Sequence, residues 1–353
     1  MNLPKRITAK KQYLAKRLFL LPSLFALMLL PSNLFSQSKV GTTAAQFLGI
    51  GIGQRANAMG GAFVALGNDV SALYWNPGAI SRTGSSQIVL SHTGWLVNTN
   101  FNWVGLQINI DGGNTIGVSL TQLNYGDDEP VYTVTQPEGT GERWGAQDNC
   151  IALSYARNLT DRFSIGGSVK YISQKIWNES ASAVALDVGL LYITNFHGLR
   201  IGMSISNFGT DLTLDGKDLT QPIDLDGNNF GNNPNIPSKL KTDAWPLPLF
   251  FRVGIAMDIM QSENFRATFA LDALRPNDNT EVLNIGGEVS FKEIFFVRGG
   301  YKSLFRTDSE EGLALGAGVK YRLFSDTDVM IDYSYQDFGV FENVQSFSFG
   351  LTF

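Results

Sequence analysis

Apolar and polar residues alternate along the chain from about residue 86 to residue 353. Because successive side chains of a strand point to opposite faces, this pattern predicts strands with one apolar face and one small or charged face. In residues 312–322 the apolar set is Leu313, Leu315, Ala317, Val319 and Tyr321. About fourteen segments share the pattern, near residues 86–94, 100–110, 114–125, 148–157, 163–175, 184–194, 199–207, 248–258, 263–274, 281–290, 294–302, 312–322, 328–337 and 344–353.

Two kinds of connection join these segments. Short turns are expected at residues 111–113, 158–162, 195–198, 259–262, 291–293 and 323–327. Longer links are expected at residues 95–99, 126–147, 176–183, 208–247, 275–280, 303–311 and 338–343. The two kinds alternate, so all longer links fall on one side. Up-and-down strands with tight turns at one end and longer loops at the other are typical of a bacterial outer-membrane barrel.

A soluble β-sandwich is the competing interpretation, since its strands alternate too. The expected strands run about 9–12 residues, longer than the usual 5–6 and suited to a tilted membrane strand. Their number is even. The chain ends in a strand with Phe349, Leu351 and Phe353, which resembles the signal read by the bacterial barrel-insertion machinery. We therefore predict an all-β, 14-stranded antiparallel transmembrane β-barrel over residues 86–353, closed because lipid offers no hydrogen bonds.

Aromatic residues near the predicted strand ends are candidates for the interfacial girdles of such a barrel. They are Phe101, Trp103, Tyr125, Trp177, Tyr192, Phe251, Tyr301 and Tyr321.

The first 36 residues have a different character. Six basic residues lie among the first 17, and an apolar run of about a dozen residues follows from Leu18 to Leu30. With the small Ser36 before Gln37, this is typical of a cleaved secretory signal peptide. The alternative is a membrane anchor, but the run is shorter than the about 20 residues that span a bilayer, and it contains Pro22. We expect residues 1–36 to be the signal peptide and residues 37–85 to be a separate segment before the barrel.

Charge argues against a nucleic-acid partner. The chain has 27 Lys and Arg against 32 Asp and Glu, and the expected signal peptide holds six of the basic residues and no acidic one. The remaining chain therefore carries a net charge of −11. Nucleic acids need a basic protein face.

Cofactor, metal and catalytic chemistry have little support. Cys150 is the one cysteine, which excludes cysteine-based zinc motifs. His92 and His197 are isolated from any recognisable nucleophile, so we expect no enzyme and no cofactor. Residues 224–229 resemble part of a calcium loop but lack its closing Glu, and a solvated surface loop is the favoured interpretation.

The alternation also assigns charged side chains to the barrel interior. Both signs are present: the inward set is Lys170, Asp187, Arg252, Asp258, Arg266, Asp272, Glu288, Arg298, Lys320, Arg322 and Asp332. A 14-stranded barrel is too wide for its own side chains to fill, so it holds water or a plug. The charges then form ion pairs across the lumen and to a plug, or they line a solute path.

Residues 37–85 lack the strand alternation and are small and apolar, which suits an N-terminal plug inside the barrel. Residues 44–50 and 56–66 are expected to form short helical turns. Within the segment, Gly51-x-Gly53-x-x-Ala56 matches a dinucleotide-binding turn, but no βαβ unit surrounds it. We interpret its glycines as places where the plug backbone passes close to the barrel wall.

Residues 53–78 resemble the N-terminal signature of the PorV/PorQ family of Bacteroidetes outer-membrane barrels. The matching positions are Arg55, Met59, Gly60, Gly61, Asn68, Asp69, Tyr74, Trp75, Asn76, Pro77 and Gly78. The strand count, the C-terminal strand and residues 247–254 extend the resemblance. The FadL fatty-acid channels look like distant relatives with a similar N-terminal hatch. The chain departs from the family where Gly78 precedes Ala79, since the family more often has Asn-Pro-Ala-Gly.

The resemblance implies a non-enzymatic part in type IX protein secretion from the outer membrane of a Gram-negative bacterium of the Bacteroidetes. The expected partners are outer-membrane lipid, the secretion translocon and cargo with C-terminal sorting domains. The longest links, residues 126–147 and 208–247, are the expected docking surfaces. The alternative is a FadL-like transporter that takes up a hydrophobic ligand through the plugged lumen.

Overall fold

The computed structural model describes residues 39–126, 128–225, 233, 235–306, 309–324 and 326–353. The predicted signal peptide, residues 1–36, lies outside these ranges. So do residues 226–229 of the segment that resembles a calcium loop.

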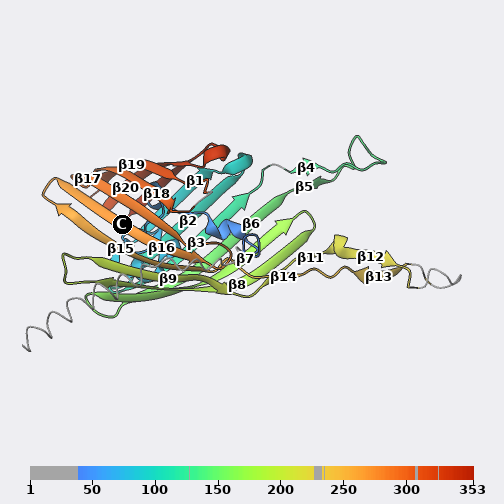
Figure 1. Cartoon of the computed structure of the whole chain (residues 1–353), viewed down its shortest axis with the longest axis horizontal. Coiled ribbons are helices and arrows are strands. Elements are labelled where there is room, and N and C mark those ends of the chain that lie inside the picture. The colour runs from blue at the N-terminus through green and yellow to red at the C-terminus, as the bar shows by residue number, and fades with distance from the viewer. Residues whose placement is uncertain (1–38, 127, 226–232, 234, 307–308, 325) are drawn as a thin grey trace, which may run out of the picture. The chain divides into compact units, whose positions relative to one another are not determined.

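Fourteen antiparallel strands form a closed barrel within the described residues (Figure 1). The ring closes where β1 pairs with β21, with Gln87 opposite Thr352, and where β8 pairs with β9. This confirms the predicted fold class, including its strand number. The strands are β1 (Gln87–Gly94), β2 (Asn100–Asn109), β3 (Asn114–Asn124), β6 (Ala146–Asn158), β7 (Phe163–Ile176), β8 (Glu179–Ile193), β9 (Arg200–Gly209), β15 (Phe250–Gln261), β16 (Phe265–Pro276), β17 (Val282–Phe291), β18 (Phe295–Leu304), β19 (Leu313–Phe324), β20 (Thr327–Asp337) and β21 (Asn343–Thr352).

Tight turns lie at one end of the barrel and longer loops at the other, which we call the turn end and the loop end. In bacterial outer-membrane barrels the end with tight turns faces the periplasm. One loop prediction is wrong. Residues 176–183 were expected to form a longer link, but β7 runs to Ile176 and β8 begins at Glu179. Only Trp177 and Asn178 connect them. The two strands stay hydrogen-bonded to each other beyond their apolar residues, as far as the pair Ile176 and Glu179.

Two loops carry strands of their own. β4 (Glu129–Pro130) pairs with β5 (Arg143–Trp144), and β12 (Thr220–Ile223) pairs with β13 (Ile236–Lys239). Both two-stranded ribbons extend from the loop end (Figure 1). The second loop also holds β10 (Leu212–Thr213), β11 (Asp215–Gly216), β14 (Ala244–Trp245) and the 3-10 helix η4 (Lys217–Leu219).

The remaining helices are short, and four of them lie between the N-terminus and β1. These are the 3-10 helix η1 (Gln46–Gly49), the helices α2 (Gln54–Ala58) and α3 (Ala72–Trp75) and the 3-10 helix η2 (Pro77–Arg82). The 3-10 helices η3 (Leu96–Asn98) and η5 (Gly339–Phe341) lie in loops. Across the described part of the chain, no helix is long and apolar enough to span a membrane.

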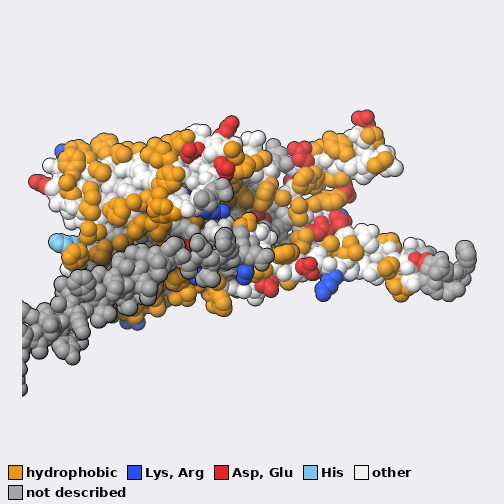
Figure 2. Space-filling model, in the orientation of Figure 1, with side chains coloured by type: hydrophobic (Ala, Val, Ile, Leu, Met, Phe, Trp, Pro, Cys, Tyr) orange, Lys and Arg blue, Asp and Glu red, His pale blue; other side chains and the backbone are white. Residues whose placement is uncertain are grey.

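The outer wall of the barrel is apolar, as Figure 2 shows for one face. Leu313, Leu315 and Val319 of β19 are each between 44% and 47% exposed, as the alternation predicts for a lipid-facing side. Two girdle candidates are wrong. Phe101 and Trp103 of β2 are 2% and 1% exposed, so they face inward and help to fill the lumen. Alternation places a residue on one of two faces, but aromatic character alone does not say which face is outside.

Candidate functional site

The segment before β1 lies inside the barrel and supplies most of the buried core. Met59, Phe63, Ala72 and Ile80 are fully buried there. α2 packs mainly against β19 and β20, and η2 packs against β6, β7 and β8, so the plug contacts opposite arcs of the wall. Residues 45–82 therefore close the lumen across its width, and we call them the plug.

The plug is less helical than expected. η1 falls within the predicted turn at residues 44–50, but the second predicted turn, residues 56–66, is wrong in its bounds. α2 starts at Gln54 and ends at Ala58. Gly60 and Gly61 follow with φ of 65° and 76°, a left-handed conformation that ends a helix.

Close approach of plug and wall depends on glycines in both. A Cβ atom at Gly300 of β18 would overlap the backbone of Met59 and Gly60, and one at Gly78 would overlap the backbone of Gly189. Gly53 of the dinucleotide-like turn faces Ser71, which also belongs to the plug. The glycines that bring plug and wall together are thus Gly60, Gly78 and wall glycines, and the expectation for Gly51 and Gly53 is wrong.

Asn76 fixes the turn of the Asn-Pro-Gly element. Its side-chain amide donates to the carbonyl of Val64 in the plug (2.8 Å) and to the carbonyl of Leu190 in β8 (2.9 Å). Its Oδ1 accepts a hydrogen bond from the backbone N–H of Gly78 (3.1 Å) and so caps η2. Pro77 stands at the first turn of that helix, where its missing N–H costs nothing. The fully buried Asn76 therefore joins two plug segments and the wall.

Arg55 is the second anchor. Its Nε and Nη2 donate to the two carboxylate oxygens of Glu288 on β17, at 2.7 and 2.9 Å. Its Nη1 donates to Asn68 (2.7 Å) and Asp69 (3.1 Å), so one guanidinium ties α2, the following plug turn and the wall together. Paired, planar hydrogen bonds of this kind are the strong ones among charged groups.

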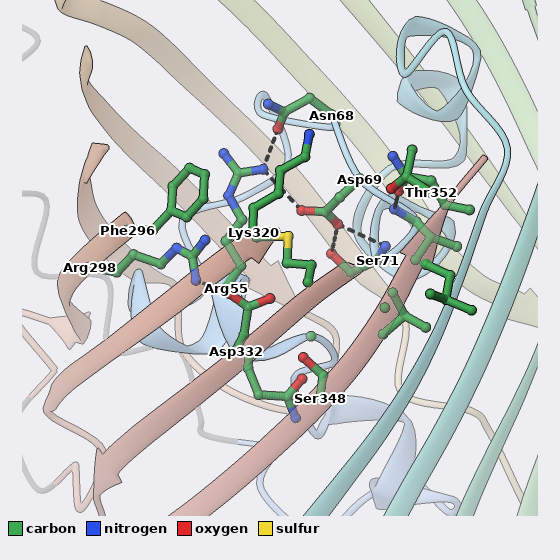
Figure 3. A pocket seen from close by; sticks show the side chains of 18 of the residues that line it. Arg55, Asn68, Asp69, Ser71, Phe296, Arg298, Lys320, Asp332, Ser348 and Thr352 are labelled. Carbon is green, nitrogen blue, oxygen red and sulfur yellow. Dashed lines mark hydrogen bonds and ion pairs between the residues drawn. The ribbon is translucent and has the colours of Figure 1, made fainter. Parts of the chain in front are cut away.

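The wall continues this ion network. Glu288 also accepts from Arg298 Nε (2.7 Å) and Arg266 Nη2 (3.1 Å), and Arg298 Nη1 donates to Asp332. Figure 3 shows Arg55, Arg298 and Asp332 converging beside a small cavity of about 150 Å³ on the turn-end side of the plug. Because cations and carboxylates alternate through the network, each buried charge has a partner of opposite sign.

The other charged residues predicted to face inward differ in how far they are buried. Lys170 contacts Asp187 (2.6 Å), and Asp272 Oδ2 accepts from the backbone N–H groups of Phe63 (2.7 Å) and Val64 (2.8 Å). The buried members of the set are Lys170, Asp187, Arg252, Asp272, Glu288, Arg298 and Asp332. Three are half-buried: Asp258, Arg266 and Lys320. Arg322 is exposed at the turn end, where it pairs with Asp328 at 3.0 Å.

The predicted plug motif is mostly buried in the same way. Its buried members are Arg55, Met59, Gly60, Gly61, Tyr74, Trp75, Asn76, Pro77 and Gly78. Asn68 is exposed and Asp69 is half-buried at the turn-end cavity, where Asp69 also accepts from the backbone N–H of Ser71 (2.9 Å).

The three residues proposed as the insertion signal lie on β21 and at its end. Phe349 and Phe353 are 44% and 56% exposed, and Leu351 is half-buried beside them. Phe353 and Ser86 exchange backbone hydrogen bonds at 2.9 and 3.0 Å, so the C-terminus is tied to the start of β1.

On the loop-end side, two larger cavities adjoin and share Gln46, Ile50 and Trp95. One has a volume of about 500 Å³ and is bounded by Tyr74, Trp75, Phe250 and Arg252, among others. The second, of about 910 Å³, is mainly apolar. We call the two together the vestibule. Its floor is the plug, so a ligand from the outside would meet Tyr74 and Trp75.

Sequence reasoning missed some of the residues that organise this interior. Asn207 has a positive φ of 66°, at the bulge where β9 shifts register against β8. Its N–H donates to Asp187 (2.7 Å), and its Oδ1 accepts from Lys170 (2.8 Å). An Asn at the end of the predicted segment 199–207 was the one available signal. Within the described ranges, no cluster of His, Cys, Asp and Glu could hold a metal ion.

One family model matches the chain. It is described as Type IX secretion system protein PorV, and it covers residues 33–230, more than half of the sequence. No curated protein sequence matches.

Several solved structures with the same fold are described as a hydrocarbon channel or as toluene transporters. The CymD monoaromatic hydrocarbon channel has a TM-score of 0.55 at 13% identity, over 86% of this chain and 96% of that one. The Pseudomonas putida toluene transporter TodX has a TM-score of 0.53 at 11% identity, over 86% and 97% of the two chains. The Ralstonia pickettii toluene transporter TbuX has a TM-score of 0.50 at 13% identity, over 86% and 97%. At these identities the likeness establishes the barrel fold alone.

Proposed function

Because this chain belongs to the family of the type IX secretion system protein PorV, we propose that it acts as a docking protein in the outer membrane. Its partners would be the secretion translocon and cargo with C-terminal sorting domains. The family and the barrel place the chain among outer-membrane proteins of type IX secretion. We further propose that the protein comes from a bacterium of the Bacteroidetes and that residues 1–36 are cleaved as a signal peptide.

The closed lumen is the observation that carries this proposal. The plug spans the barrel and is anchored at separate points by Arg55, Asn76 and Asp272. A folded protein cannot pass such a lumen. A secretion role is therefore better served by surfaces that bind other proteins than by conduction through the barrel.

The loop end offers such surfaces. The β4–β5 ribbon exposes Tyr132 (61%) and Val134 (102%), and the loop with β12 and β13 exposes Leu225 (74%) and Leu240 (57%). Apolar side chains this exposed on projecting ribbons are a usual feature of protein-binding sites. Acidic residues lie among them at the loop end (Figure 2).

Deletion of the gene tests the docking function. The culture medium and the cell surface of the mutant would be profiled by mass spectrometry, with the gene restored on a plasmid as the control. We expect proteins with C-terminal sorting domains to be lost from both fractions. If those proteins are still exported and attached normally, the secretion function is rejected.

A second candidate is transport of a hydrophobic small molecule. The similar solved structures are described as a monoaromatic hydrocarbon channel and as toluene transporters, and the vestibule has an apolar chamber of about 910 Å³. This function predicts that the mutant loses growth on, or uptake of, a hydrophobic substrate such as toluene. Secretion of sorted proteins would then be unchanged, which separates the two candidates.

A further inference from the structure

The cavity on the turn-end side of the plug is lined by polar atoms that the chain does not satisfy. Gln54 and Arg298 line it and are 1% and 2% exposed. Gln54 Nε2 donates to Ser91 Oγ (2.6 Å), but its Oε1 is buried without a hydrogen-bond partner. Arg298 donates through Nε to Glu288 (2.7 Å) and through Nη1 to Asp332, but its Nη2 is buried without a partner. One acceptor and one donor are therefore unmatched beside the same cavity.

Three further groups at this cavity keep hydrogen-bonding capacity (Figure 3). Lys320 Nζ contacts Asp328 at 3.0 Å, and an ammonium group has further N–H donors. Asp332 accepts from Arg298 through Oδ1, and its Oδ2 accepts no hydrogen bond from the residues that the structure describes. The hydroxyl of the buried Ser348 makes no hydrogen bond to that part of the chain either. Donors and acceptors of both charges thus remain available in one small space.

The charges around the cavity balance. Its walls hold four cations and three carboxylates, and the buried Glu288 accepts from three of those cations. The cations are Arg55, Arg266, Arg298 and Lys320, and the carboxylates are Asp69, Glu293 and Asp332. Asp328 pairs with Lys320 and also with Arg322. A ligand with a net charge would upset this balance, whereas a neutral ligand with separate positive and negative groups would keep it.

The size of the cavity restricts the ligand further. Its volume of about 150 Å³ equals that of about five water molecules. An ammonium group, one carbon atom and a carboxylate need about this much space, whereas a saccharide or a lipid chain is larger. Val89, Phe296 and Met330 form an apolar part of the wall, against which the carbon atoms of a ligand can pack.

We propose that the turn-end cavity binds the zwitterionic head group of an amino acid. The ammonium group of the ligand donates to Gln54 Oε1 and Asp332 Oδ2. Its carboxylate accepts from Arg298 Nη2 and Lys320 Nζ, and hydrogen bonds between charged groups are the strong ones. The inference goes beyond both candidate functions above, since the cavity lies on the other side of the plug from the vestibule.

Two sources could supply this head group. The turn end of bacterial outer-membrane barrels faces the periplasm. The ligand is therefore a free amino acid of that compartment or the end of a cell-wall peptide that carries diaminopimelate, whose side chain ends in the same ammonium and carboxylate.

Ligand-observed NMR titration of the purified full chain in detergent micelles tests the head group. The probe is glycine. It is compared with glycinamide, which keeps the ammonium group alone, and with N-acetylglycine, which keeps the carboxylate alone. We expect each analogue to bind about tenfold or more weakly than glycine, because each loses hydrogen bonds to charged groups.

Variants of the cavity wall locate the site. Gln54→Leu and Lys320→Met should each weaken glycine binding about tenfold, and both leave the ion pair of Arg55 with Glu288 in place. Arg322→Met is the matched control and should bind glycine like wild type, because Arg322 also pairs with Asp328 but does not line the cavity. Each variant is first checked for folding by its heat-dependent mobility shift in gel electrophoresis.

Titration with the tripeptide L-Ala-γ-D-Glu-meso-diaminopimelate separates the two sources. Tighter binding of the tripeptide than of glycine, with retention of the protein on purified cell-wall sacculi, assigns the cell-wall peptide. Equal or weaker binding of the tripeptide assigns a free amino acid. The inference is overturned if neither zwitterion binds saturably, or if inorganic phosphate or N-acetylglycine binds as tightly as glycine. Unchanged glycine affinity in folded Gln54→Leu and Lys320→Met would overturn it as well.

Discussion

At the scale of single residues, the interior depends on a few polar side chains that each join several elements. Arg55 contacts Glu288 through two hydrogen bonds and Asp69 through a third. Asn76 similarly joins Val64 and Leu190. Both residues were identified from the sequence motif. Glu288 was also predicted to face inward, but its pairing with Arg55, and that of Leu190 with Asn76, was not predicted, because each pair is separated by more than one hundred residues along the chain.

Replacing Arg55 with Met should weaken the folded barrel markedly. The change leaves Glu288 and Asp69 with one cation fewer, and loss of one partner of a buried pair costs about 3–5 kcal/mol. Because Glu288 keeps Arg298, we expect the lower part of that range. Urea unfolding in micelles, followed by tryptophan fluorescence, measures the change. Lys239→Met, at the exposed pair with Asp215, is the control and should not shift the midpoint. An equal midpoint for Arg55→Met and wild type would contradict the anchor.

A pH effect is expected at the turn between β17 and β18. The hydrogen bond from Arg266 lowers the pKa of Glu293, which lies in that turn outside the membrane-spanning strands. A carboxyl whose pKa is lowered by folding adds stability above its unfolded pKa of about 4.3. That stability is lost as the pH falls through the lower, folded pKa. Glu293→Gln should therefore unfold at lower urea than wild type at pH 7, with the gap closing below about pH 4.

The Glu293 experiment is read from urea midpoints measured across that pH range. Glu138→Gln, on the exposed β4–β5 ribbon, controls for the removal of one negative charge. A gap between Glu293→Gln and wild type that stays constant from pH 7 to pH 3 would show that the carboxylate of Glu293 is not responsible.

At the scale of elements, the strands followed from local pattern and the plug contacts did not. All fourteen predicted segments fall on strands, although β8 begins at Glu179 and not near residue 184. Lipid outside and a plug inside impose opposite demands on neighbouring residues, which produces the alternation. Phe101 and Trp103 were expected in the interfacial girdles but face the interior, where large apolar side chains fill space beside the plug. From the sequence, the glycines of the wall look like ordinary small residues. The structure shows that Gly300 lies against the backbone of Met59 and Gly60, which leaves no room for a side chain.

Gly300→Ala should displace the plug from β18. A methyl group there would overlap the backbone of Met59 and Gly60, and backbone cannot move aside as a flexible side chain does. We expect a loss of about 1–3 kcal/mol in urea unfolding and faster proteolysis of the plug. The neighbouring Gly299 is the matched control, since a Cβ there meets only the side chain of Leu315 at 3.7 Å. Similar losses for Gly299→Ala and Gly300→Ala would mean that the wall, and not the plug contact, is sensitive.

At the scale of the whole molecule, the barrel carries ribbons that contribute little to its own closure. β12 and β13 pair only with each other, and isolated two-stranded ribbons are marginally stable in water. Their position at the loop end suits a role in contacts with other proteins.

Replacing residues 218–241 with a short Gly-Ser linker should leave the barrel folded and remove a docking surface. The heat-dependent gel shift and the urea midpoint should match wild type, because the fourteen-strand ring is untouched. Co-purification of partner proteins from outer membranes with the tagged variant should fall several-fold. The same replacement in the β4–β5 ribbon, residues 130–143, shows which ribbon binds. Unchanged co-purification with both ribbons replaced would rule out the ribbons as the docking surface.

The barrel, its strand number, its two unlike ends and the presence of a plug could all be predicted from the sequence. Each of these rests on short-range pattern: alternation within a strand, the length of a link, and a compact motif such as Asn76-Pro77-Gly78. The pairing of individual charges could be read from the three-dimensional arrangement alone. Arg55 forms an ion pair with Glu288, whereas Arg252 has no carboxylate at ion-pair distance among the residues that the structure describes, although both are arginines in the same interior. Those distances are set by the cross-strand register and by the path of the plug. Register and path in turn depend on contacts between residues far apart in the chain.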